Sequence, residues 1–170
     1  MDISKDADKP EMAIGKILLA DNMSIASAES CTGGLICSML TDVPGSSSYV
    51  AGGVISYSNK IKHDVLGVPQ DILDTSGAVS EETALAMSNG VRKLMKTDIG
   101  VSSTGVAGPS PSEGKPVGLI YLSVSTANRN VVRSYMFSGS RTDIKHQAAQ
   151  MAIRLVIETV GRRENDENKE

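Results

Sequence analysis

The clearest hydrophobic pattern in the chain lies in residues 80–96, where apolar side chains recur at helical intervals. Its apolar positions are Ala84, Met87, Val91 and Leu94. A spacing of three and four residues places them on one face of an α-helix. Ser80, followed by two glutamates, is typical of a helix N-cap, and Lys93 and Lys96 suit the C-terminal end of the helix dipole. The pattern predicts a helix with one buried face.

The C-terminal third of the chain combines a hairpin pattern with a second helical pattern. Residues 117–125 and 131–137 are rich in β-branched and apolar residues, and the segment 127–130 between them (Ala-Asn-Arg-Asn) indicates a turn. A helix follows over 141–161, opened by Ser140. Its apolar positions are Ile144, Ala148, Met151, Leu155 and Val156.

The same criteria predict an alternation of helices and strands along the rest of the chain. We expect helices at about 11–21, 32–41 and 59–66, and strands at about 24–29, 50–57 and 99–104. Helices that alternate with strands and end in a hairpin favour an α/β fold, specifically a three-layer α/β/α sandwich with a mixed β-sheet. We expect one domain over residues 11–161, between flexible polar tails at 1–10 and 162–170.

Composition narrows the protein class. With 170 residues, 40% of them hydrophobic, the chain can bury a core of its own. It has no apolar stretch long enough for a membrane span, and Met1–Lys5 lacks the layout of a signal peptide, so we expect a cytoplasmic protein. A net charge of −3 and the absence of tryptophan argue against a nucleic-acid partner.

Cysteine and histidine usage gives no sign of a metal site. Cys31 and Cys37 are the only cysteines, and the histidines are His63 and His146. Neither pair has the ligand spacing of a zinc site, so we expect reduced cysteines and no metal.

The segment Ala28–Gly34 is the most informative for chemistry. It joins a predicted strand to a predicted helix, and a hydroxyl residue in such a turn sits where nucleophiles are often held. The amides at the helix start, next to Gly33 and Gly34, could hold an oxyanion or a phosphate. The alternative is structural: Ser30 or Thr32 simply caps the helix.

Two further strand ends carry candidate groups. Tyr57 ends the strand at 50–57 and Lys62 follows it; a lysine with a lowered pKa can act as a base, although most lysines are solvated surface charges. The stretch from Thr104 to Pro109, which includes Gly105, fits an anion or carboxamide site as well as an ordinary turn. Arg141, at a helix start where its charge opposes the dipole, is the best-placed arginine for an anionic group.

Together these segments resemble the C-terminal domain of the competence-damage-inducible protein (CinA) family, over about residues 11–160. The matching strings are Ala28–Gly34, Pro44–Ser47, Tyr57–Asn59 with Lys62, Gly77–Ser80, Thr104–Pro109, Lys115–Gly118 and Phe137–Gly139 with Arg141. Stand-alone members of the family are nicotinamide-nucleotide amidases. The resemblance therefore implies hydrolysis of nicotinamide mononucleotide to nicotinate mononucleotide and ammonia, without a metal or other cofactor.

The resemblance also implies roles for individual residues. Ser30 is the nucleophile, Lys62 the base and Tyr57 a proton-relay or orienting partner. The segment at Thr104 and Gly105 lines the substrate site, and Arg141 meets the phosphate. The amides around Thr32, Gly33 and Gly34 then supply the oxyanion donors.

Several alternatives stay open at this point. Cys31 is a rival nucleophile, ranked second because it should face away from Ser30. The loop after Pro109 reads Ser110–Gly114, whereas the family usually has a glycine-rich loop there, so rate or specificity could differ. The chain could also be a catalytically silent nucleotide-binding module, or an amidase for another carboxamide. The resemblance implies a homo-oligomer, with a dimer favoured.

Overall fold

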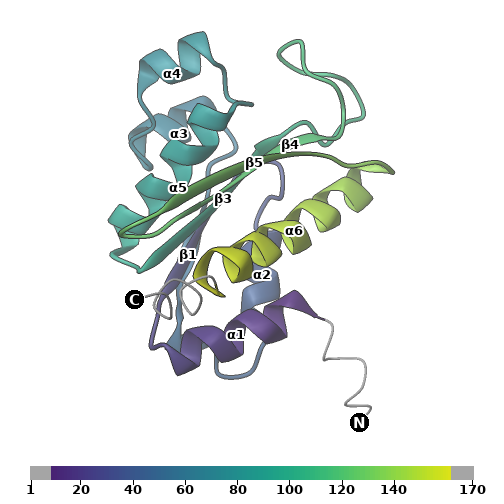
Figure 1. Cartoon of the computed structure of the whole chain (residues 1–170). Coiled ribbons are helices and arrows are strands. Elements are labelled where there is room, and N and C mark those ends of the chain that lie inside the picture. Colours follow the sequence, from purple (N-terminus) through teal and green to yellow (C-terminus); the bar gives the residue numbers. More distant parts are fainter. Residues whose placement is uncertain (1–8, 162–170) are drawn as a thin grey trace, which may run out of the picture.

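A computed structural model describes residues 9–161, and Figure 1 shows a sheet with helices on both faces. The helices are α1 (Pro10–Ala20), α2 (Leu35–Thr41), α3 (Asn59–Asp64), α4 (Gln70–Thr75), α5 (Glu81–Met95) and α6 (Arg141–Gly161), with a 3-10 turn, η1 (Ser46–Ser48). The strands are β1 (Ile25–Glu29), β2 (Val50–Ile55), β3 (Ile99–Gly105), β4 (Leu119–Ser125) and β5 (Asn130–Met136). Of the predicted tails, only Lys9 and Pro10 fall within the described residues, and Pro10 already belongs to α1.

The five strands form one mixed sheet in the order β2-β1-β3-β4-β5. β1 runs parallel to both β2 and β3, whereas β3, β4 and β5 pair antiparallel. The predicted α/β class with a mixed sheet between helical layers is confirmed. The predicted hairpin is confirmed too, because Ser125 of β4 pairs with Asn130 of β5.

The two faces of the sheet differ in side-chain size. Along β3, Ile99 and Val101 point into the core shared with α1, α2 and α6. The alternate position, Gly100, faces α5: a Cβ there would lie 2.1 Å from the carbonyl oxygen of Ser88. Small residues on this second face therefore let α5 lie close against the sheet.

The order of the strands places a crevice at the carboxyl ends of β1 and β3. From β1 the chain passes through α2 to β2 at one edge, and then returns through α5 to β3 on the other side of β1. Because parallel crossovers are right-handed, the opposite directions put α2 and α5 on opposite faces. Ligands of α/β proteins bind in the crevice at such a switch point.

Two predicted boundaries need correction, and two short elements were not predicted. α2 begins at Leu35 rather than at residue 32, because Gly33 and Gly34 adopt φ values of +62° and +102°, which a right-handed helix does not contain. The strand predicted over 50–57 ends at Ile55. Neither α4 nor η1 was predicted, since each is too short for a periodic pattern.

The long helices otherwise follow their sequence patterns. Ser80 caps α5 by accepting a hydrogen bond from the Thr83 amide (3.2 Å), and Ala84, Met87 and Val91 are buried. Leu94, assigned to the same stripe, is 49% exposed. It borders a groove that is also lined by residues 64–67 and Pro69.

Candidate active site

Ser30 is the first residue after β1, and the sheet fixes its backbone. Its amide donates to the carbonyl oxygen of Ser103 on β3 (2.9 Å), and its own carbonyl oxygen accepts from the amide of Gly33 (3.2 Å). The residue is 9% exposed. The serine is thus held at the carboxyl end of a central strand, in the crevice that the topology creates.

The carboxylate of Glu29, next to Ser30, is buried and 1% exposed. It accepts five hydrogen bonds of 2.7–3.0 Å, from the hydroxyls of Ser27 and Thr32 and from the amides of Gly34, Ile36 and Cys37. A buried carboxylate is stable only with such a set of donors. Glu29 therefore ties the end of β1 to the start of α2 and fixes the turn that carries Ser30.

This network changes the roles predicted for Thr32, Gly33 and Gly34. The Gly34 amide is bonded to Glu29, and the Gly33 amide to the carbonyl of Ser30. Thr32 is fully buried, and its hydroxyl is bonded to Glu29 and Ser103. None of the three lines the cavity, and the amides of Gly33 and Gly34 are already engaged within the turn, so these two are not free to hold an oxyanion.

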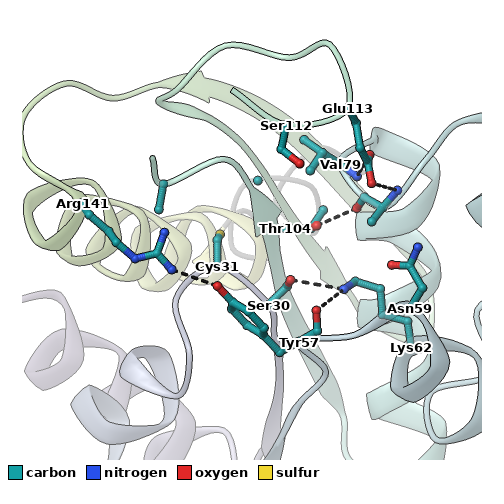
Figure 2. A pocket seen from close by; sticks show the side chains of 13 residues that line it. Ser30, Cys31, Tyr57, Asn59, Lys62, Val79, Thr104, Ser112, Glu113 and Arg141 are labelled. Carbon is teal, nitrogen blue, oxygen red and sulfur yellow. Dashed lines mark hydrogen bonds between the residues drawn. The ribbon is translucent and has the colours of Figure 1, made fainter. Parts of the chain in front are cut away.

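Lys62 comes from α3, whose start is capped by the hydroxyl of Ser58 accepting from the Ile61 amide (3.3 Å). The Lys62 side chain is 1% exposed, and its Nζ lies 3.2 Å from Oγ of Ser30. Nζ also donates to the carbonyl oxygen of Ser56 (2.8 Å) and, more weakly, to that of Tyr57 (3.5 Å). Figure 2 draws the contacts of this amine with Ser30 and Tyr57 as dashed lines.

The surroundings of Lys62 suit a base. Burial lowers the pKa of its amine, and the negative charges of the Cys31 thiolate form and of Glu113 oppose that shift. The two carbonyls can only accept, so they engage two N–H groups of the amine. In the neutral amine, the remaining lone pair is then directed at Oγ of Ser30.

Tyr57 and Arg141 form a second pair at the opening of the cavity. Nη2 of Arg141 donates to the Tyr57 hydroxyl (2.9 Å), and Nη1 donates to the carbonyl oxygen of Gly108 (2.5 Å). Because the tyrosine oxygen accepts from the guanidinium, its own proton can be donated elsewhere. Tyr57 is 63% exposed, so this pair meets solvent.

A cavity of about 220 Å³ joins these groups. It is lined by Ser30, Cys31, Tyr57, Asn59, Lys62, Ala78, Val79, Thr104, Gly105, Ala107, Ser112, Glu113 and Arg141. Thr104 and Gly105, both predicted from the sequence, line one wall, and the Thr104 hydroxyl donates to the carbonyl oxygen of Ala78 (2.6 Å). In Figure 2, Lys62 and Asn59 lie on one side of Ser30, and Arg141 lies on the other.

Cys31 lines the cavity but is a poor nucleophile there. Its side chain is 5% exposed, and burial is the main cause that raises the pKa of its thiol to about 12. The reactive thiolate is therefore scarce at neutral pH. The electrostatic surroundings favour Ser30 over Cys31.

Asn59 and Glu113 are lining residues that sequence reasoning did not select. Asn59 stands at the start of α3, in the same strand-to-helix segment as Tyr57, which was a usable signal. Glu113 lies in the loop that departs from the family pattern. Its distance in sequence from Ser30 and Lys62 concealed that it borders the same cavity.

Two kinds of feature are absent from residues 9–161. Within that range, no group of three or more His, Cys, Asp or Glu side chains is placed to hold a metal ion. No helix in it is long and apolar enough to cross a membrane.

Comparison with known sequences points to one family. The family model of the CinA C-terminal domain matches residues 7–160. A competence-damage inducible protein of Desulforamulus reducens is 45% identical over 152 residues, which cover 89% of this chain and 37% of that protein. A CinA-like protein of Syntrophotalea carbinolica is 45% identical over 141 residues, or 82% and 34% of the two chains. The chain therefore spans little more than a third of the length of these curated relatives.

Comparison with solved structures gives the same result. The competence/damage inducible protein CihA of Agrobacterium tumefaciens superposes with a TM-score of 0.85 at 36% identity, covering 88% of this chain and 92% of that one. The competence damage-inducible protein A of Klebsiella pneumoniae gives a TM-score of 0.88 at 26% identity, covering 91% and 96%.

Proposed function

Because this chain belongs to the CinA C-terminal domain family, we propose that it is an amidohydrolase acting on the carboxamide of nicotinamide mononucleotide. The products are nicotinate mononucleotide and ammonia. One observation carries the proposal: the buried Nζ of Lys62 lies 3.2 Å from Oγ of Ser30. A hydroxyl within hydrogen-bond reach of a buried amine is the arrangement of an activated nucleophile.

In the proposed reaction, Oγ of Ser30 attacks the carboxamide carbon and its proton passes to the neutral amine of Lys62. The resulting ammonium returns that proton to the leaving nitrogen, the C–N bond breaks and ammonia departs. An ester between Ser30 and the nicotinoyl group remains. Lys62 then accepts a proton from the water that attacks this ester and returns it to Oγ of Ser30 as the bond between the acyl carbon and Oγ breaks, and nicotinate mononucleotide leaves.

The tetrahedral oxyanion needs donors other than the amides that Glu29 engages. The Tyr57 hydroxyl is one candidate, because it accepts from Arg141 and keeps its own proton for donation. The Arg141 guanidinium, exposed at the cavity opening, is the group that suits the 5′-phosphate. The cavity of about 220 Å³ is smaller than the roughly 300–1,000 Å³ of typical ligand pockets. This size suits a binding mode in which the nicotinamide ring enters the cavity and the phosphate stays outside it.

The test is ammonia release from nicotinamide mononucleotide by the purified protein in the presence of a metal chelator. Ser30→Ala and Lys62→Ala should each lower kcat by at least roughly 100- to 10,000-fold, which is the usual effect of losing a positioned general base. Lys60→Ala is the matched control: Lys60 lies on the same helix but its side chain is 80% exposed and paired with Asp64. Binding without turnover by the parent protein would instead support a silent nucleotide-binding module.

Arg141 distinguishes nicotinamide mononucleotide from a substrate without a phosphate. Arg141→Ala should raise KM for nicotinamide mononucleotide by roughly 10- to 100-fold, the worth of a charge-assisted hydrogen bond, and Arg141→Lys by less. The riboside, which has no phosphate, should be affected little by either change. Equal losses with both substrates would favour an amidase for a different carboxamide.

A further inference from the structure

Glu113 supplies the negative charge among the residues that line the cavity, and the proposed function gives it no role. The same cavity is lined by two basic side chains, Arg141 and Lys62, the second of which is cationic in its ammonium form. A ring that carries a positive charge would be repelled by such a pair. A carboxylate at the same cavity offsets that repulsion, and its charge acts on Lys62 directly, where it opposes the effect of burial on the pKa.

The turn that carries Glu113 is built in an unusual way. Ser112 and Lys115 exchange two backbone hydrogen bonds (2.8 and 3.2 Å), which leaves Glu113 and Gly114 as the two central residues of a tight hairpin. Both have positive φ, +51° and +69°. Asn, Asp or Gly adopts that backbone more readily than Glu. Strain of this kind is kept where the surrounding structure imposes it, and it concentrates at functional sites.

Contacts to the neighbouring loop hold the Glu113 side chain in place. Its carboxylate oxygens accept from the amides of Ala78 (3.3 Å) and Val79 (3.1 Å), which precede α5. It lies against Gly77, where a Cβ would approach the carboxylate to 2.6 Å. Figure 2 shows Glu113 beside Val79 at the wall of the cavity. A carboxylate has about four acceptor positions, so two amides do not saturate it.

Lys115, at the other end of the turn, also fastens the turn to the neighbouring loop, but its side chain carries no negative charge. Its Nζ donates to the carbonyl oxygens of Ser76 and Val79. Glu113 and Lys115 therefore share the task of fastening the turn to residues 76–79, but Glu113 alone of the two borders the cavity. The pair allows the structural and electrostatic roles of Glu113 to be separated.

We propose that Glu113 is a specificity-determining residue that selects a positively charged, N-substituted aromatic ring over a neutral ring of the same shape. The proposal rests on the proposed function and names the ring chemistry of its substrate. The positive charge of an N-alkylated pyridinium is spread over the ring, so a carboxylate on the cavity wall stabilises it without a directed hydrogen bond.

The experiment compares two ligands that differ only in ring charge: nicotinamide mononucleotide and benzamide riboside 5′-monophosphate. Binding is measured by calorimetry in the Ser30→Ala background, so that turnover and differences in reactivity do not intervene. Without a change at residue 113, the cationic ligand should bind more tightly. Adding Glu113→Gln should weaken its binding by roughly 3- to 10-fold, in the range of a solvent-accessible ion pair, and leave the neutral ligand nearly unchanged.

Lys115→Met is the control for loosening of the turn, because it should alter both affinities by the same factor. Equal weakening of both ligands by Glu113→Gln would overturn the inference and leave Glu113 with a structural role alone. Equal affinities of the two ligands before any change at Glu113 would overturn it as well. If the Ser30→Ala protein binds neither ligand, the proposed function itself fails, which is a separate result.

Discussion

The amine of Lys62 is under two opposing influences. Burial lowers its pKa, whereas the carbonyl oxygen of Ser56 and the charge of Glu113 favour the ammonium form. The net effect is a lowered pKa, so the neutral amine needed to accept the Ser30 proton is more abundant than in a solvated lysine. The chemistry of the site therefore depends on how completely water is excluded from the Lys62 amine.

A pH profile tests this at the residue scale. Only the neutral amine is active, so kcat/KM should rise by about tenfold per pH unit below the pKa of Lys62 and level off above it. Because that pKa is lowered from 10.5, the plateau should begin below pH 10.5. Lys60→Ala should leave the profile in place. A rate that is flat or falls as the pH increases would contradict Lys62 as the base.

At the scale of the element, α2 depends on a residue that lies outside it. The helix has seven residues, and its N-cap, Gly34, offers no side chain. The carboxylate of Glu29 replaces the missing cap by accepting from the amides of Gly34, Ile36 and Cys37. The same carboxylate fixes the turn of Ser30, so the stability of the helix start and the position of the nucleophile are coupled.

Glu29→Gln should break that coupling. The carboxamide has one acceptor oxygen, and its NH₂ group faces donors, so at least one buried amide loses its partner. We expect unfolding free energy to fall by about 1–3 kcal/mol, measured by urea titration, together with a lower kcat. Glu81→Gln, an exposed acid in the first turn of α5, should change stability by less than about 0.5 kcal/mol. An unchanged kcat would show that the turn holds Ser30 without Glu29.

At the scale of the whole molecule, an apolar cluster packs on each face of the sheet, and residues of the sheet contribute to both clusters. The larger cluster joins α1, α2 and α6 to one face, and the smaller joins α5 and the segment after α3 to the other. Ala26 and Ile25 are neighbours in β1 but belong to different clusters. Loss of packing on either face should therefore destabilise the same sheet.

Ile153→Ala and Met87→Ala, on opposite faces of the sheet, test whether the two clusters unfold together. Both side chains are fully buried, so each truncation should lower the unfolding free energy by about 2–5 kcal/mol. A single urea transition monitored by circular dichroism should shift to lower midpoint in both variants, with an unchanged slope. Two separate transitions in either variant would show that the faces unfold independently.

The homo-oligomer implied by the family resemblance stays a prediction.

The sequence by itself determined the alternation of elements and the identity of the chemical groups. Periodicity and capping residues are local, so α5, α6 and the β4–β5 hairpin could be predicted from neighbours along the chain. Short elements such as α4, and a helix start set by positive φ at Gly33, were missed because they leave no periodic signal. The family strings also identified Ser30, Tyr57, Lys62, Thr104 and Arg141, which the fold does bring to one cavity.

Only the tertiary structure decided which polar groups are free for a ligand and which are engaged. The amide of Gly34 looked available in the sequence, but a buried Glu29 engages it. Glu113 looked like a loop residue, yet it borders the cavity with Lys62, fifty-one positions earlier in the chain. Hydrogen-bond satisfaction, burial and electrostatic proximity depend on segments that meet in space, and spacing along a single chain does not contain that information.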